Sequence, residues 1–185
     1  ASRGLGDVYK RQGETLVSSA VPTLADDVFF NTTPDNTIGG TISVTGNIAA
    51  NSLTFNTTGG TLLSQSGNRT LSLGTGGITV NSGAGNATIG VSTNSLSVQL
   101  TGNQTWTNNS TNILNVRSLR VSDLASGTTA LTLNAANSGA ITFNLAASDS
   151  PDTFKARAIV IGSAGTGAVN MVGSSFSGGT TIKRG

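Results

Sequence analysis

The chain has 185 residues, which is long enough for one domain with its own hydrophobic core. Only 10% of the residues are charged, the formal net charge is +2, and neither cysteine nor histidine is present. This composition excludes disulfides, thiol catalysis and cysteine or histidine metal ligands, and it removes the side chain that most often acts as a general base near neutral pH.

The first twelve residues, "ASRGLGDVYKRQ", are rich in charge and match nothing that follows. Without them, three of the ten basic and one of the eight acidic side chains are lost, so seven of each remain and the net charge is zero. The run "DVYKRQ" resembles the translation of a transposon end used to tag DNA for sequencing. We therefore expect residues 1–12 to be a non-native, disordered scar with few contacts to the domain. The neutral remainder gives no support for nucleic-acid binding.

Residues 13–36 contain the first strand-like segment, "VFFN", directly after Asp26 and Asp27. Two adjacent carboxylates could ligate a cation, but aspartate before a β-rich run is more typical of a turn. We expect residues 13–36 to be a lead-in or an N-terminal cap of the main domain.

From Thr41 to Ile182, short segments alternate apolar and polar residues between Gly, Asn and Ser, which is the pattern of β-strands. The best candidate for a helix, residues 111–127, is equally well explained as two strands, "ILNV" and "SLRVS". The sequence therefore predicts an all-β fold. The expected inward-facing sets are Ile42/Val44, Leu53/Phe55, Leu71/Leu73, Ile78/Val80, Ile89/Val91, Leu96/Val98/Leu100, Leu131/Leu133, Ile141/Phe143/Leu145, Ile159/Ile161 and Val169/Met171.

These segments recur. Leu53 is followed after 18 residues by Leu71 and after another 18 by Ile89, and a second series has a spacing of 20. Recurrence of this kind is typical of a β-solenoid, here with about eight or nine coils in a rod of roughly 40 Å. The alternative is an antiparallel β-sandwich, which also has many short strands. Residues 37–185 contain no Asn-Gly or Asp-Gly hairpin signal, which favours the solenoid.

Five segments also resemble a known family: "VPTLADDVFFNTTP", "NSLTFNTTGGTLL", "RTLSLGTGGITVNSGAG", "LTGNQTWTNNSTNILNV" and "FSGGTTIKRG". They are similar to autotransporter-associated β-strand repeat proteins, although Lys183 and Arg184 replace the Asn-Ala that usually follows the last motif. The resemblance implies a single-stranded right-handed parallel β-helix in the passenger region of a large bacterial surface protein. It further implies that residues 37–185 are a passenger segment, truncated at the C-terminus, with neighbouring repeats at both ends.

Two features are candidates for contact with glycans. Trp106 lies among polar residues, where it could stack on a sugar or instead point inward and fill a corner of a coil. The densest charged cluster is Asp149, Asp152, Lys155 and Arg157, which could form a polysaccharide-lyase or calcium-binding site. A solvated loop interrupted by Pro151 explains the same cluster without a function.

We expect a structural passenger segment without catalytic activity, metal or cofactor, displayed outside the cell as an adhesin, with extracellular glycans or cell surfaces as partners. Between Asn36 and Ser148 only four residues are charged and one of them is acidic, so that span offers no carboxylate pair for glycoside hydrolysis. No apolar run approaches the roughly 18 residues of a membrane-spanning helix. A glycan-active β-helix enzyme and a carbohydrate-binding module are the alternatives.

Overall fold

The computed structural model describes residues 2–4, 9–12, 15–17, 21–30, 40–65, 67–91, 96–117, 120–123, 129–144, 154–155, 158–163, 166–172 and 179–184. Within these ranges all regular elements are β-strands, and no helix that could cross a membrane is found. The strands are β1 (Ser2–Gly4), β2 (Tyr9–Gln12), β3 (Thr15–Val17), β4 (Asp27–Phe30), β5 (Gly40–Val44), β6 (Ile48–Phe55), β7 (Thr61–Gln65), β8 (Arg69–Val80), β9 (Ala87–Ile89), β10 (Leu96–Leu100), β11 (Gln104–Asn108), β12 (Leu114–Val116), β13 (Arg120–Asp123), β14 (Ala130–Ala135), β15 (Ile141–Asn144), β16 (Phe154–Lys155), β17 (Ala158–Ser163), β18 (Val169–Val172) and β19 (Gly179–Arg184).

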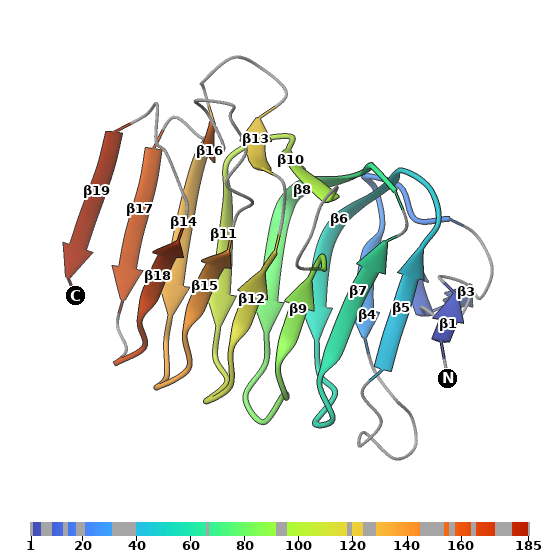
Figure 1. The fold of residues 1–185 in the computed structure, drawn as a ribbon, viewed down its shortest axis with the longest axis horizontal. Coiled ribbons are helices and arrows are strands. Elements are labelled where there is room, and N and C mark those ends of the chain that lie inside the picture. Colours follow the sequence, from blue (N-terminus) through green and yellow to red (C-terminus); the bar gives the residue numbers. More distant parts are fainter. Residues whose placement is uncertain are drawn as a thin grey trace.

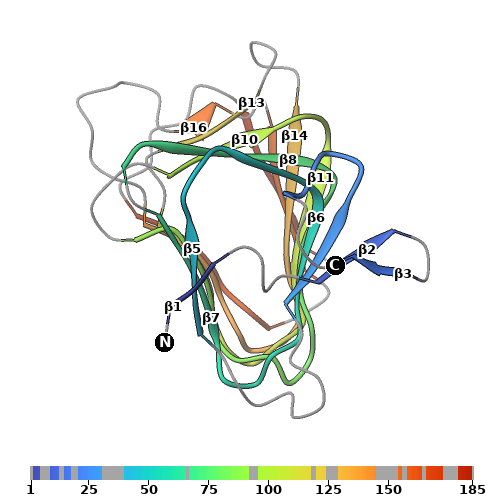
Figure 2. The same cartoon turned by 90° about the vertical axis from the view of Figure 1, so that its right-hand side faces the viewer.

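The strands form a right-handed parallel β-helix with a three-sided cross-section (Figure 2). Face A consists of β1, β5, β7, β9, β12, β15 and β18, which lie side by side along the stack (Figure 1). Face B consists of residues 48–50 of β6, residues 69–73 of β8, and β10, β13 and β16. Face C consists of β4, residues 52–55 of β6, residues 77–80 of β8, and β11, β14, β17 and β19.

Strand pairing confirms the solenoid and excludes the antiparallel sandwich. Within each face, every described pair of strands is parallel. The antiparallel pairs of the described chain are those that β2 makes with β3 and β4. The helix candidate at residues 111–127 contains β12 and β13, as the two-strand interpretation predicts.

The coil is longer than the sequence suggested. Ile78 pairs with Trp106, and Trp106 pairs with Leu133, so equivalent positions are 28 and 27 residues apart rather than 18 or 20. The predicted spacing was wrong because Leu53, Leu71 and Ile89 lie on faces C, B and A in turn. One face takes about a third of a coil, so a step of 18 residues moves two faces onward. Face A accordingly has seven strands, fewer than the predicted number of coils.

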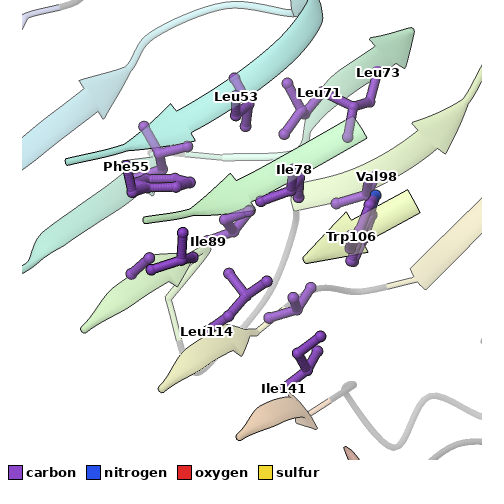
Figure 3. Close-up of a cluster of buried hydrophobic side chains, with 14 of the residues drawn as sticks. Leu53, Phe55, Leu71, Leu73, Ile78, Ile89, Val98, Trp106, Leu114 and Ile141 are labelled. Atoms are coloured by element: carbon purple, nitrogen blue, oxygen red, sulfur yellow. The ribbon is translucent and has the colours of Figure 1, made fainter. Parts of the chain in front are cut away.

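The core is a column of aliphatic side chains inside the three faces. Figure 3 shows Leu71 and Leu73 from β8, and Ile89 and Leu114 from β9 and β12, all pointing into the same interior. Two aromatic pairs extend the column, with ring centroids 4.6 Å apart for Phe30 and Phe55 and 5.6 Å apart for Trp106 and Phe143. Each buried side chain of this kind contributes about 1.5–3 kcal/mol relative to exposure, so the column can stabilise the fold without ion pairs.

The N-terminal region differs from the expectation for residues 1–12. β1 pairs in parallel with β5, and β2 pairs with β3 and with the edge of β4, so the segment contacts the solenoid where few contacts were expected. The strand register does not bear on the origin of the segment, which stays a prediction. β4 pairs in register with β6, so the coil stack already includes Asp27–Phe30, within the segment expected to be a lead-in or cap.

Candidate functional site: corners and outer faces of the solenoid

Trp106 lies inside the solenoid. Its side chain is 0% exposed, and its indole Nε1 donates a hydrogen bond of 2.8 Å to Oε1 of Gln104. The ring stacks on Phe143, which lies on face A in the next coil. The inward placement that the sequence allowed is therefore the observed one, and the role as a sugar-stacking platform is wrong because the ring has no exposed surface.

The structure describes one residue of the charged cluster. Asp149, Asp152 and Arg157 lie outside the described residues, and Lys155 lies in β16, which pairs in parallel with β13. Within the described ranges, no group of three or more acidic side chains could hold a metal ion. A glycan-active site at residues 149–157 stays a prediction.

Asp26 closes a turn with Thr23, as predicted, whereas Asp27 is already the first residue of β4. Oδ2 of Asp26 accepts hydrogen bonds from the backbone N–H of Thr23 at 2.8 Å and from its hydroxyl at 2.7 Å. Oδ1 of Asp27 accepts from Nδ2 of Asn51 at 2.9 Å and from the hydroxyl of Ser52 at 2.6 Å. These carboxylates therefore bind donors from the turn itself and from the next coil.

Asparagine side chains connect consecutive coils at all three corners. Oδ1 of Asn47, between faces A and B, accepts from the backbone N–H of Thr70 at 3.0 Å. Oδ1 of Asn103, between faces B and C, accepts from Ala130 at 2.8 Å. Oδ1 of Asn86, between faces C and A, accepts from the backbone N–H of Ile113 at 3.0 Å. These bonds continue the coil-to-coil pairing where the strands end.

The most extensive polar network lies at the corner between faces C and A. Nδ2 of Asn108 donates to the carbonyl oxygens of Asn112 at 2.8 Å and Ala140 at 3.0 Å, while its Oδ1 accepts from the N–H of Ser110 at 3.0 Å. The hydroxyl of Ser110 and Nδ2 of Asn112 both donate to the carbonyl oxygen of Ala84. Asn108 and Ser110 are fully buried, so this network ties three successive coils together from the inside.

This network is absent from the sequence-based candidates. The run "TNNSTN" that forms it carries two other interpretations there, as part of a segment that resembles the autotransporter repeats and as the polar surroundings of Trp106. A signal was present, since Asn108, Ser110 and Asn112 are hydrogen-bonding residues spaced by two, and most of the buried side chains in the described chain are hydrophobic.

The outer faces A and B carry polar side chains that bind one another. On face A, Nδ2 of Asn144 donates to Oδ1 of Asn115 at 2.9 Å, and Nδ2 of Asn170 donates to the hydroxyl of Thr142 at 3.2 Å. On face B, Ser72 and Gln99 pair across β8 and β10 at 3.4 Å. Many of the outward hydrogen-bonding groups of these faces are therefore occupied by neighbouring coils.

Face C is different. Its strands align two outward columns, and these are Ser52, Gly77, Thr105 and Thr132 in the first and Thr54, Thr79, Thr107 and Asn134 in the second. In the described chain, the threonine hydroxyls of both columns form no hydrogen bond to protein. No charged residue lies in the face C strands from Ser52 to Asn134. The middle of face C therefore presents uncharged threonine hydroxyl and methyl groups. At one end of the first column the carboxylate of Asp27 binds the hydroxyl of Ser52, and Lys183 continues the second column at the other end.

Comparison with known proteins adds no relative: no protein-family model, curated protein or solved structure matches the chain. The fold thus rests on the strand register, and the resemblance to autotransporter repeats rests on the sequence segments that carry it.

Proposed function

We propose that the chain is a stiff, non-catalytic β-helix segment of an exported bacterial surface protein of the autotransporter-passenger type. In this function the coil stack projects or presents surface outside the cell, as in an adhesin, and neighbouring repeats continue the stack at both ends. Its partners are extracellular glycans or other cell surfaces.

The observation that carries this proposal is the continuity of coil-to-coil bonding. On face C, β4, β6, β8, β11, β14, β17 and β19 pair one after another in parallel. Corner asparagines and the buried Asn108 network add bonds between the same coils. Separating two coils requires all these bonds to break together, which gives a solenoid its stiffness.

Secretion tests the proposal directly. The full chain is placed between a signal peptide and the translocator of a known autotransporter, and its arrival outside the cell is measured by its accessibility to antibody on intact bacteria. We expect surface display comparable to that of the native passenger, with a passenger-sized band that resists mild protease treatment. Retention in the periplasm, or digestion to small peptides on intact cells, would count against the proposal.

Binding and turnover assays on polysaccharides separate this function from the alternatives. A structural segment leaves acidic and neutral polysaccharides intact. Turnover that Asp152→Ala abolishes would establish the enzyme instead.

A further inference from the structure

Face C combines three properties that matter for a binding surface. Its outward side chains form a mesh, because strands lie about 4.8 Å apart and alternate residues along a strand lie about 6.7 Å apart. Thr105 and Thr107 occupy two neighbouring points on one strand, and Thr79 and Thr132 occupy points on the strands at either side. The positions of the hydroxyls are therefore set by the pairing of strands from consecutive coils.

The hydroxyls of this mesh are available to an external partner. Several polar groups of face A bind one another, as Asn170 does with Thr142. In the described chain, Thr54, Thr79, Thr105, Thr107 and Thr132 have no such partner; Thr105 is exposed and the other four are half-buried. Thr41 and Thr88 on face A also lack a partner, so what sets face C apart is that its free hydroxyls lie on four consecutive strands.

The partner must share the properties of the mesh. The face C strand segments between Ser52 and Asn134 carry no charged residue, which disfavours nucleic acid, acidic polymers and anionic membranes as partners of this part of the face. The single tryptophan is buried, so face C offers no indole platform for individual sugar rings. A rigid, repeating, neutral array is complementary to a rigid, repeating, neutral surface.

We propose that face C binds ice. Water oxygens on some planes of ice form a rectangular mesh of dimensions similar to those of adjacent strands and alternate residues. Threonine methyl groups leave room for water between the columns, and the hydroxyls hydrogen-bond to that water, so the hydration layer of face C can join the crystal lattice.

The test uses the full chain and two measurements, thermal hysteresis with crystal shape in a nanolitre osmometer, and the share of protein taken up by slowly growing ice. Thr107→Tyr enlarges one side chain in the middle of the mesh. Thr88→Tyr is the matched control, since Thr88 is also a half-buried outward threonine of a short strand but lies on face A. Both substitutions keep a residue suited to strands, and Trp106 fluorescence reports folding.

We expect faceted crystals and uptake into ice for the unaltered chain and for Thr88→Tyr, and a severalfold loss of both for Thr107→Tyr. Should Thr107→Tyr fail to fold, Thr79→Val is used instead, because it removes a hydroxyl at nearly constant shape. We expect it, too, to reduce crystal faceting and uptake into ice. Rounded crystals identical to those in buffer, exclusion from ice, or equal losses in both tyrosine variants would overturn the proposal. Depletion by crystalline cellulose or chitin without uptake into ice would overturn it in favour of a polysaccharide surface.

Discussion

Two corners in neighbouring coils provide partners for the turning backbone in different ways. Between faces C and A, the chain turns around buried side-chain amides, with Asn108 bound to Ser110, Asn112 and Ala140. Between faces B and C, β8 turns without a break through its glycines, and Gly77 has a φ of +66°. A Cβ on Gly77 would lie 2.2 Å from the carbonyl oxygen of Thr105 in the next coil.

The comparison shows what a turn in a stacked coil requires. Backbone groups leave the strand ladder at a corner, and they must find other partners or stay hydrated. The first corner supplies side-chain donors and acceptors inside the stack. The second removes side chains so that consecutive backbones approach closely, and adds Gln104, whose Nε2 donates to the carbonyl oxygen of Leu73 at 3.2 Å.

The largest expected effect is at the glycine corner. Gly77→Ala places a Cβ against backbone that cannot move without shifting a whole coil, and it also strains a left-handed conformation, so we expect a loss of about 3 kcal/mol in the free energy of unfolding. Gly83→Ala is the control, because Gly83 has a φ of +80° with nothing within 4 Å of its Cβ. It should lose about 1 kcal/mol from conformation alone. Urea unfolding followed by Trp106 fluorescence measures both, and equal losses would show that close approach is unimportant.

The next largest effect is at the amide corner. Asn108→Ala leaves the N–H of Ser110 and the carbonyl oxygen of Ala140 without their side-chain partner in the interior, at a cost of about 2–3 kcal/mol. Asn109→Ala removes a half-buried neighbour and should change stability by less than about 0.5 kcal/mol. Comparable losses in the two variants would mean that burial of the amide is not what stabilises this corner.

Asn108→Asp tests the same corner through the pH dependence of the free energy of unfolding. The new carboxylate keeps the acceptor for Ser110 but faces the carbonyl oxygens of Asn112 and Ala140, so its pKa should be raised in the folded state. A raised folded-state pKa means that the native protein binds the proton more tightly than the unfolded chain. Destabilisation should therefore be greatest at neutral pH and should diminish as the pH falls through the raised pKa. An unchanged stability difference between pH 7 and pH 4 would contradict this.

The contrast between the corners also explains what the sequence could predict. Strands such as β10 and β14 were predicted because their inward residues are aliphatic, and the sum of such strands indicated the solenoid. β11 was missed as a strand because its inward residues are Gln104, Trp106 and Asn108. Alternation of aliphatic and polar residues is enough to predict a strand, but a strand with polar inward residues lacks that alternation and is missed.

The coil length and the polar network could not be read from one sequence. All three faces present the same alternating aliphatic pattern, so nothing local distinguishes a step of one face from a step of a whole coil. Asn, Ser and Thr are so frequent that the three residues of the buried corner do not stand out. Only the register, which brings Asn108 beneath Ala140 and above Ala84, reveals their role.

A smaller effect is expected from the polar contact beside the glycine corner. Gln104→Leu leaves the buried indole N–H of Trp106 without an acceptor, at a cost of about 1–2 kcal/mol. Trp106→Phe removes that donor, so adding it to Gln104→Leu should cost less than Trp106→Phe alone. A double-mutant cycle in urea measures the difference. Additive losses would show that Gln104 acts through the carbonyl oxygen of Leu73 and not through the indole.

The smallest effect is expected at the exposed asparagines, one at each kind of corner. Asn86→Ala and Asn103→Ala each remove one acceptor for a backbone N–H that water can reach, so each should cost about 0.5–1 kcal/mol. Asn68→Ala, at an exposed asparagine, is the control and should be nearly neutral. Equal small losses at Asn86 and Asn103 would place the difference between the corners in their buried parts. A much larger loss at Asn103 would mean that the glycine corner depends on side-chain acceptors as well, because close backbone contact alone would then be insufficient to hold consecutive coils together.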